Sequence, residues 1–267
     1  MRNTRMSTYK ETFRRLDRAA LIPFFVIGDP DESRSFELVK AAIDAGADVL
    51  EMGIPFSDPI ADGPTIQKAD LRALAAGMTP SKALAFIHRV TDYRPIPIGL
   101  LVYYNLVWQY GVERFFKDFK AVGGSSVLVA DLSIDDADEV IAPARAAGLE
   151  TVFMVTPNTG SDRMRRIAER TTGFIYTVST LGVTGARNRL SDTVKPLVAR
   201  LKEVTGVPVC VGFGISSPEQ AAEVATAGAD GVIIGSRIVQ IVEDHLNEPD
   251  RAVEEVARFI RQVREAL

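Results

Sequence analysis

Short apolar runs rich in β-branched residues alternate along the chain with segments of helical spacing, and this alternation constrains the fold more than any other feature. The runs lie at residues 21–27, 49–52, 96–103, 126–130, 151–156, 174–178, 207–213 and 231–234. Between two of them, Val112, Phe115, Phe116, Phe119 and Val122 recur at the spacing of one helix face. Strands that are apolar on both faces and alternate with amphipathic helices predict a parallel sheet covered by helices.

Eight such units in 267 residues favour a closed (β/α)8 TIM barrel over an open doubly wound sheet. A helix-like segment at residues 8–20 precedes the first run, so we expect an extra N-terminal helix. Length and a hydrophobic content of 46% would also allow two small domains. Because no linker, low-complexity tract or charge block marks a boundary, we expect a single α/β domain over residues 1–267.

Charge and hydropathy exclude several classes of function. The formal charge of −4 comes with scattered Lys and Arg rather than a basic stripe, so we expect no nucleic acid partner. Residues 1–15 lack an apolar core, and no apolar run approaches the length of about 18 residues that spans a membrane. The single cysteine, Cys210, rules out an internal disulfide. We therefore expect a cytoplasmic protein without a membrane partner.

Three glycine-containing loops follow the last three predicted strands, at residues 182–185, 212–216 and 235–236. Glycine lets the backbone approach an anion closely, and N–H groups at the start of a short helix bind phosphate oxygens. Loops after strands 7 and 8 of a TIM barrel commonly bind phosphate. A glycine can also simply end a strand, but three such loops at one corner of the barrel favour a phosphate site.

Lysine, histidine and metal chemistry lack suitable residues in this chain. The eight lysines fall on predicted helices or outer segments, which argues against a Schiff-base aldolase. His88 and His245 lie on helix-like stretches away from the strand ends, and Cys210 lies within a predicted strand. We therefore expect neither a metal site nor a histidine-based triad.

Glu51 and Asp62 remain as candidates for proton transfer. Glu51 lies in the second apolar run, and Asp62 follows eleven positions later in a loop. In the predicted barrel Glu51 would lie near Phe24, Leu101 and Met154, so desolvation would raise its pKa, whereas Asp62 in a polar loop would stay ionised. The alternatives are an ion pair inside the barrel for Glu51 and a turn or cap for Asp62.

Residues 51–67, EMGIPFSDPIADGPTIQ, resemble the signature of the tryptophan synthase alpha subunit family over its full length. The resemblance covers nearly the whole chain, because further segments follow in the family's order at residues 23–24, 28–30, 103–105, 182–185, 212–216 and 235–236. It implies a lyase of tryptophan biosynthesis. The implied reaction is the retro-aldol cleavage of indole-3-glycerol phosphate to indole and glyceraldehyde 3-phosphate, without metal or organic cofactor.

The resemblance also implies roles for individual residues. Glu51 would protonate C3 of the indole ring and assist proton removal from the glycerol hydroxyl. Asp62 would hold the indole N–H and stabilise the positive charge that develops there, and Thr184 would orient Asp62 when its loop closes. The implied indole pocket comprises Phe24, Leu101, Tyr176 and Phe213. The implied phosphate site comprises Gly185, Gly214, Gly235 and Ser236.

The family's alpha subunit docks on a pyridoxal-phosphate beta subunit in an α2β2 complex, so the resemblance implies the same partner here. Contacts are expected around Asp58 and Pro59 and in the loop after the fourth strand. In that second loop, residues 131–136 read DLSIDD, with Ser133 where a proline is usual and two aspartates where glutamates are usual. Loss of a proline gives the backbone of a loop more conformational freedom.

Three alternatives to a catalytic alpha subunit stay open. The altered loop motivates a stand-alone indole-3-glycerol phosphate lyase, or a secondary-metabolism paralogue, that releases free indole. A catalytically silent activator of a beta subunit would be expected to lack one acid, yet Glu51 and Asp62 are both present. Another phosphosugar barrel enzyme, such as an isomerase, would need acid–base residues on other strands, where the sequence offers no candidates.

Overall fold

The predicted strands form the wall of a parallel β-barrel. The computed structural model describes residues 9–178, 190–212 and 214–267. The strands in this part of the chain are β1 (Ala20–Val26), β2 (Leu50–Gly53), β3 (Ile98–Val102), β4 (Ser126–Val129), β5 (Glu150–Thr151), β6 (Phe153–Val155), β7 (Ile175–Val178), β8 (Val209–Gly212) and β9 (Gly231–Ile234). Their order in the sheet is β5-β4-β3-β2-β1-β9-β8-β7-β6, and each neighbouring pair is parallel.

The barrel closes at its fifth wall segment, which is the fifth predicted strand. The sequence predicts one strand over residues 151–156, but the structure divides this segment into β5 and β6, with Val152 between them. β5 pairs with β4 and β6 pairs with β7, while the Val152 N–H donates to the carbonyl oxygen of Val127 at 3.0 Å. Because β5 and β6 are successive pieces of one segment, the two ends of the sheet meet. This arrangement confirms the (β/α)8 prediction.

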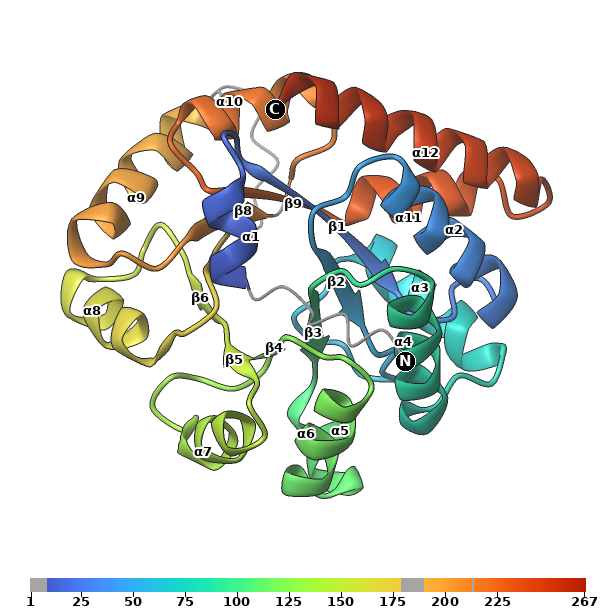
Figure 1. Cartoon of the computed structure of the whole chain (residues 1–267), viewed down its shortest axis with the longest axis horizontal. Helices are drawn as coiled ribbons and strands as arrows, with labels where there is room; N and C mark the ends of the chain where they lie inside the picture. Colours follow the sequence, from blue (N-terminus) through green and yellow to red (C-terminus); the bar gives the residue numbers. More distant parts are fainter. Residues whose placement is uncertain (1–8, 179–189, 213) are drawn as a thin grey trace.

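Helices surround the barrel (Figure 1). Their bounds are α1 (Tyr9–Arg15), α2 (Glu32–Asp44), α3 (Pro64–Ala75), α4 (Pro80–Tyr93), α5 (Tyr104–Tyr110), α6 (Val112–Ala121), α7 (Asp138–Ala146), α8 (Ser161–Arg170), α9 (Leu190–Val204), α10 (Pro218–Thr226), α11 (Ser236–Asp244) and α12 (Pro249–Ala266). The helix predicted over residues 112–122 is α6, which buries Phe115, Phe116 and Phe119. Proline in the first turn starts α3, α4, α10 and α12, where its missing N–H costs no hydrogen bond.

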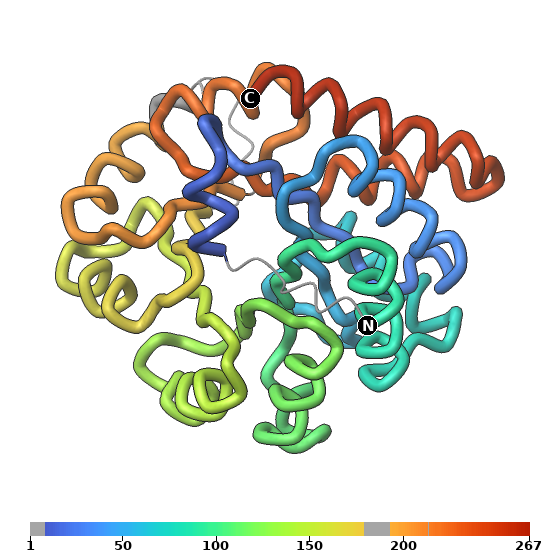
Figure 2. Tube along the Cα trace, viewed as in Figure 1, coloured from blue at the N-terminus to red at the C-terminus, as the bar shows by residue number. Residues whose placement is uncertain are grey.

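The C-terminal helix α12 joins the two ends of the helical ring. It lies beside α2 and α10, as the trace in Figure 2 shows. Its buried side chains, Val256, Phe259, Ile260 and Val263, recur at intervals of three or four residues and so share one face. The first and last parts of the chain therefore pack into one hydrophobic layer around the barrel.

The predicted extra N-terminal helix is present as α1, which crosses one end of the barrel instead of joining the ring (Figure 1). Tyr9 of α1 is 1% exposed, and its ring lies 5.5 Å from that of Phe174. Its hydroxyl forms a 2.8 Å hydrogen bond with Ser126 Oγ. A Cβ on Gly99 would lie only 2.6 Å from the Tyr9 hydroxyl, so glycine is required there. Since Gly99 is the second residue of β3 and Ser126 the first of β4, α1 closes the N-terminal end of the barrel.

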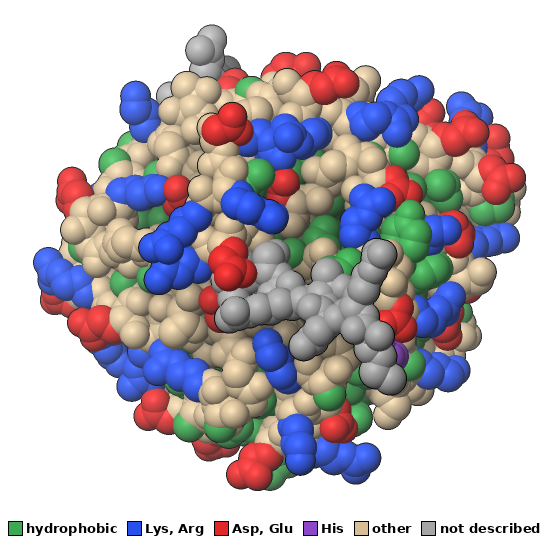
Figure 3. Space-filling model, in the orientation of Figure 1, with side chains coloured by type: hydrophobic (Ala, Val, Ile, Leu, Met, Phe, Trp, Pro, Cys, Tyr) green, Lys and Arg blue, Asp and Glu red, His purple; other side chains and the backbone are tan. Residues whose placement is uncertain are grey.

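The surface carries charges of both signs. Basic and acidic side chains are interspersed over the face shown in Figure 3. None of the helices within the described ranges is long and apolar enough to cross a membrane.

Candidate active site

A pocket lies at the C-terminal end of the barrel, where loops after the strands meet. Its lining combines two acids, several apolar side chains and the glycine-containing loops after β8 and β9. The lining residues are Phe24, Glu51, Asp62, Gly63, Ile66, Leu101, Tyr176, Gly214, Ile215, Ser216, Ile233, Gly235, Ser236 and Arg237. These residues come from both halves of the chain, and closure of the barrel brings them together.

Glu51 is the second residue of β2 and is 4% exposed. The parallel register places it beside Phe24 of β1 and Gly99 of β3. Its Oε2 atom has no hydrogen-bond partner among the residues that the structure describes. Burial, and secondly the negative charge of Asp62, raise the pKa of Glu51 to about 8. A carboxylic acid in this state holds its proton near neutrality yet can release it, as general acid–base catalysis requires.

Buried side chains surround Glu51, and among the described residues it has no ion-pair partner. Burial raises the pKa of Tyr9, Tyr176 and Cys210, and the nearby charge of Glu51 raises each of them further. The ion pair considered for Glu51 is absent from the described part of the chain, because both influences on its pKa disfavour its ionised form. Glu51 therefore lies in a buried, largely apolar chamber beside the pocket, with Tyr9 of α1 among its electrostatic neighbours.

Asp62 lies in the loop between β2 and α3, and it is more enclosed than the sequence predicts. The Tyr103 hydroxyl donates to Asp62 Oδ2 at 2.6 Å and accepts from the Ala61 N–H at 3.1 Å. The side-chain amide of Gln67 donates to the Asp62 carbonyl oxygen at 2.8 Å. Burial raises the pKa of Asp62, and the hydrogen bond from Tyr103 lowers it. Asp62 is therefore half-buried and not simply surrounded by a polar loop, while the hydrogen bond from a tyrosine supports its ionised form.

An apolar slot adjoins the two acids. Phe24, which is 6% exposed, lies against two glycines: an added Cβ would approach its ring to 2.9 Å at Gly53 and to 3.0 Å at Gly235. Leu101 and Tyr176 also line the pocket. Because both glycines lack a side chain, the Phe24 ring can lie at the pocket wall.

The N-terminus of α11 reaches the other part of the pocket. Gly235 is the N-cap of α11 and provides no side-chain cap, so the first N–H groups of the helix lack an intrahelical acceptor. Gly235, Ser236 and Arg237 all line the pocket. Gly214, in the loop after β8, has φ +77°, a left-handed conformation that favours glycine. Free N–H groups, a helix dipole and an arginine are the features that favour binding of an anion, and the phosphate site stays a prediction.

The structure brings most of the predicted site residues together. The predicted residues that line the pocket are Glu51, Asp62, Phe24, Leu101, Tyr176, Gly214, Gly235 and Ser236. Thr184, Gly185 and Phe213 lie outside the described residues. The prediction did not name Gly63, Ile66, Ile233 and Arg237, and it included Ile215 and Ser216 only as part of the loop at residues 212–216. Arg237 had a usable signal, because a cation in the first turn of a helix opposes the helix dipole unless an anion binds there.

The groups excluded from the chemistry lie where the sequence places them. All eight lysines lie on helices, at Lys10, Lys40, Lys68, Lys82, Lys117, Lys120, Lys195 and Lys202. His88 is exposed on α4, whereas half-buried His245 ends α11, with its Nδ1 atom 2.9 Å from the Ile241 carbonyl oxygen. Cys210 is a buried core residue of β8. Within the described ranges, no group of three His, Cys, Asp or Glu side chains is arranged to hold a metal ion.

The residues predicted to contact a partner lie on two loops of the described structure. Asp58 is exposed and accepts a hydrogen bond from Ser57 Oγ, while the neighbouring Pro59 is half-buried. Ile60, next in the chain, is 83% exposed, and Trp108 of α5 is 59% exposed. Of these two, only Ile60 belongs to the loop that carries Asp58 and Pro59, since Trp108 lies on α5.

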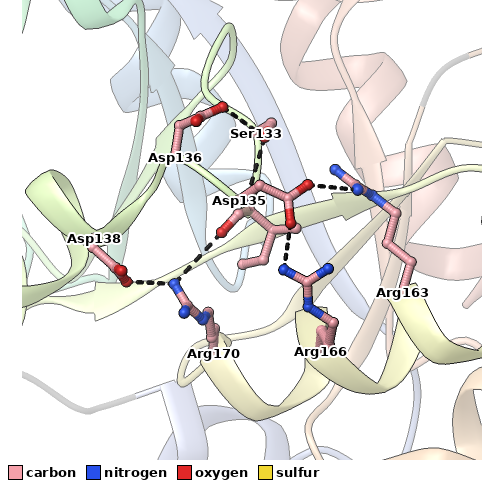
Figure 4. Close-up of polar contacts among 8 residues, drawn as sticks. Ser133, Asp135, Asp136, Asp138, Arg163, Arg166 and Arg170 are labelled. Atoms are coloured by element: carbon pink, nitrogen blue, oxygen red, sulfur yellow. Dashed lines mark hydrogen bonds and ion pairs between the residues drawn. The ribbon is translucent and has the colours of Figure 1, made fainter.

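The loop between β4 and α7 is held by polar contacts instead of a proline (Figure 4). Ser133 Oγ accepts from the Asp135 N–H at 3.1 Å and donates to Asp136 Oδ2 at 3.0 Å. The Asp135 carboxylate accepts hydrogen bonds from Arg163, at 2.7 Å, and from Arg166, both on α8. The sequence predicts a loop with more backbone freedom, because the usual proline is missing. The structure instead ties this loop to the neighbouring helix.

Comparisons with known proteins agree with this geometry. The family model described as tryptophan synthase alpha chain matches residues 11–267. The tryptophan synthase alpha chain of Methanothermobacter thermautotrophicus is 45% identical over 256 residues, which cover 96% of this chain and 95% of that one. That of Escherichia fergusonii is 44% identical, with 98% and 99% covered.

Solved structures show the same fold. Tryptophan synthase subunit alpha from Legionella pneumophila superposes with a TM-score of 0.88 at 30% identity, covering 97% of each chain. A chain of the tryptophan synthase α2β2 complex from Pyrococcus furiosus superposes with a TM-score of 0.86 at 37% identity, covering 93% of this chain and 98% of that one. Sequence, barrel and pocket agree, and the chain belongs to the tryptophan synthase alpha chain family.

Proposed function

We propose that this chain is a lyase that cleaves indole-3-glycerol phosphate to indole and glyceraldehyde 3-phosphate, as the catalytic alpha subunit of a tryptophan synthase. The observation that carries the proposal is that one pocket contains Glu51, with a pKa of about 8, the tyrosine-bound carboxylate of Asp62, and the N-terminus of α11. Membership of the tryptophan synthase alpha chain family supports it.

The pocket matches the three chemical parts of this substrate. The flat indole ring suits the apolar slot of Phe24, Leu101 and Tyr176, and its N–H can donate to Asp62. The phosphate suits the start of α11, where backbone N–H groups meet the charge of Arg237. Binding at both ends positions the glycerol chain beside Glu51, and such positioning lowers the barrier before any proton moves.

The two acids divide the work. Protonated Glu51 gives its proton to C3 of the ring, and the positive charge that develops on the ring nitrogen is stabilised by anionic Asp62. The Glu51 carboxylate then accepts the proton of the hydroxyl on the carbon attached to the ring. The bond between that carbon and C3 breaks, its electron pair returns to the ring, and the aldehyde forms. Glu51 ends protonated, so the cycle needs no external acid and, in this proposal, neither metal nor organic cofactor.

The proposed partner is a tryptophan synthase beta subunit, which would carry the pyridoxal phosphate and receive the indole. The Pyrococcus furiosus relative was solved as an α2β2 complex. In this proposal the docking surface includes Asp58 and Pro59, which precede the exposed Ile60 in the chain. The hydrogen bonds of Arg163 and Arg166 to the loop between β4 and α7 restrict this loop in place of a proline, which weakens the case for a stand-alone lyase. A single domain over residues 1–267 and a cytoplasmic location belong to the same proposal.

Indole release from indole-3-glycerol phosphate by the purified chain tests the activity. We expect Glu51→Gln and Asp62→Asn each to lower kcat by about 10²–10⁴, because each removes a positioned acid–base or charge-stabilising group. The exposed control Glu169→Gln on α8 should retain the wild-type rate. Near-normal turnover by either acid variant would contradict the assigned roles.

Addition of a beta subunit tests the partner separately. We expect complex formation by gel filtration and a changed rate of indole production in the complex. An active chain that neither binds a beta subunit nor responds to it would be a stand-alone lyase instead.

A further inference from the structure

Arg72 of α3 lies at the centre of a charged cluster for which the proposed reaction has no use. Its Nε and Nη2 atoms donate to Oδ1 and Oδ2 of Asp29 at 2.6 and 2.9 Å. Its Nη1 atom lies 4.0 Å from Oε2 of Glu243 on α11. Lys68, one turn earlier on α3, donates to Oε1 of the same Glu243 at 2.7 Å. Two cations of α3 are thus paired with acids from two other parts of the chain.

The pair of Arg72 with Asp29 is the most enclosed contact of this cluster. Asp29 is 5% exposed, and the side chain of Arg72 is 20% exposed. Burial raises the pKa of Asp29, while the hydrogen bonds and charge of Arg72 lower it and so favour the ionised form. Two parallel hydrogen bonds fix both the distance and the orientation of the partners. By contrast, the Lys68 side chain is 61% exposed, so its ion pair contributes little.

The three elements that Arg72 joins all carry residues of the pocket. Asp29 follows β1, α3 follows the loop that contains Asp62, and Glu243 belongs to the helix whose N-terminus reaches the pocket. The pocket residues on these elements include Phe24 on β1, Asp62 and Ile66 before and on α3, and Gly235 and Ser236 at the start of α11. In the proposed function the first three lie at the indole end and the last two at the phosphate end. Arg72 itself is not among the described residues that line the pocket.

Helix α3 depends on polar contacts for its position more than a ring helix does. Both α3 and α4 lie between β2 and β3, so α3 is additional to the one helix per strand of the barrel, and it packs against β1 and α11. Its buried residues are Ile66, Ala69, Asp70 and Ala73. Alanine side chains bury little apolar area, so this face provides less hydrophobic stabilisation than a leucine-rich face would. The ion pairs of Arg72 therefore matter for where α3 lies.

We propose that Arg72 is a positioning residue for the substrate site: by pairing with Asp29 and Glu243 it fixes the separation of the indole end from the phosphate end. The inference rests on the proposed function, because it uses the two ends of that substrate. A ligand that spans two half-sites gains affinity from their connection only while their separation matches the ligand, since movement of the half-sites lowers the effective concentration of the second end.

Three ligands separate the two ends of the site from the connection between them. Indole probes the apolar slot, glycerol 3-phosphate probes the phosphate site, and indole-3-propanol phosphate, which lacks the glycerol hydroxyls and is not cleaved, spans both. Arg72→Met keeps a long side chain but removes the charged fork. We expect it to raise the Kd of the spanning ligand about tenfold and to leave the Kd of each fragment within about twofold of wild type, by calorimetry or NMR titration. For indole-3-glycerol phosphate, KM should rise about tenfold with kcat within about threefold.

A matched variant separates positioning from stability. Arg18 binds Asp48 through two hydrogen bonds of 2.7 and 2.8 Å, and both residues precede strands at the opposite end of the barrel. Arg18→Met and Arg72→Met should both lower the urea midpoint of unfolding, because each leaves an acid without its cation, but Arg18→Met should bind all three ligands as wild type does. Asp29→Asn/Arg72→Met leaves no unpaired charge at Asp29 and should keep the binding defect, so it decides if Arg72→Met does not fold. Unchanged affinity for the spanning ligand, or equal weakening of all three ligands, would overturn the proposal.

A ligand-free measurement distinguishes this inference from the proposed function. Backbone amides of α3 and α11 should exchange hydrogen about tenfold faster in Arg72→Met, relative to the barrel strands of the same protein, and at the wild-type ratio in Arg18→Met. A wild-type chain that binds none of the three ligands would contradict the proposed function but leave this test in force. Wild-type exchange of both helices in the folded Arg72 variant would overturn the role of Arg72 alone.

Discussion

Tyr103 supports the ionised state of Asp62 through a single hydroxyl group. The ring is 2% exposed and stacked on Phe56, so the hydroxyl position is fixed by packing rather than by the hydrogen bond itself. The resulting 2.6 Å hydrogen bond lowers the pKa of Asp62, against the rise caused by burial. The pKa of Asp62 therefore depends on the hydroxyl group of one tyrosine. The sequence contains this tyrosine, but no local pattern shows that it contacts Asp62.

Tyr103→Phe should keep the aromatic stack and remove the donor. The pKa of Asp62 then rises, so the acid limb of the kcat/KM profile should move to higher pH, and kcat/KM at about pH 7 should fall about tenfold. Tyr110→Phe is a matched control, since its hydroxyl also donates to a carboxylate, Asp118, away from the pocket. A profile of Tyr103→Phe that overlies the wild type would show that the hydroxyl has no such role.

Glu51 should make folding less favourable at high pH. Its pKa rises from 4.5 to about 8 on folding, so the unfolded chain loses this proton first. The penalty is absent below pH 4.5, grows between pH 4.5 and about 8, and is complete above that range, with an upper limit of about 5 kcal/mol. Glu51→Gln lacks the penalty, so its stability relative to wild type should increase with pH in urea titrations. A difference that stays constant from about pH 5 to pH 9 would contradict the buried, protonated state.

At the scale of elements, α8 fixes the loop between β4 and α7. The buried side of α8 contains Met164, Ile167 and Ala168, while Arg163 and Arg166 extend to Asp135 on the loop. These ion pairs are exposed, so they contribute little to the free energy of folding. Their effect is to restrict the loop, which a proline would otherwise do by limiting backbone freedom.

The double variant Arg163→Gln/Arg166→Gln should release this loop without harming catalysis by the isolated chain. We expect kcat within about twofold of wild type and a beta-subunit Kd about tenfold weaker, because the loop must then be ordered on docking. Arg165→Gln is the matched control, since Arg165 pairs with Asp162 on the same helix. An unchanged Kd, measured by calorimetry, would remove the loop from the docking surface.

At the scale of the whole molecule, the chamber around Glu51 depends on α1. Tyr9 meets Gly99, Ser126 and Phe174, which belong to different parts of the barrel. The charge of Glu51 raises the pKa of Tyr9 beyond the effect of burial, so the two side chains are electrostatic neighbours. The helix that closes the barrel therefore also excludes water from the proposed general acid.

Tyr9→Ala should open the N-terminal end of the barrel. Loss of a large buried aromatic ring should lower the free energy of unfolding by about 3–5 kcal/mol. Water would then reach Glu51 and lower its pKa toward the ordinary value, which moves the alkaline limb of the kcat profile to lower pH. Tyr9→Phe keeps the ring and should leave the profile in place. An unmoved alkaline limb in folded Tyr9→Ala would show that α1 does not control the protonation of Glu51.

The sequence by itself determined the barrel, the two acids of the pocket and the glycine-containing loops that are predicted to bind phosphate. Continuous apolar runs and the helical period of 3.6 residues are local patterns, so they show which segments are buried, and in a closed parallel barrel the strand ends necessarily meet. Glu51 within an apolar run and the glycine loops at residues 212–216 and 235–236 could therefore be placed at one barrel mouth from their order alone.

Only the tertiary structure determined the pKa values of these groups and the contacts that order the loops. The hydrogen bond of Tyr103 to Asp62 and the pairing of Asp135 with Arg163 each join residues far apart in the chain. The division of the fifth wall segment at Val152 likewise depends on which neighbour each half pairs with. Burial and Coulomb interactions vary with distance and solvent access, which no local pattern specifies, so pKa values and loop order emerge only when the barrel closes.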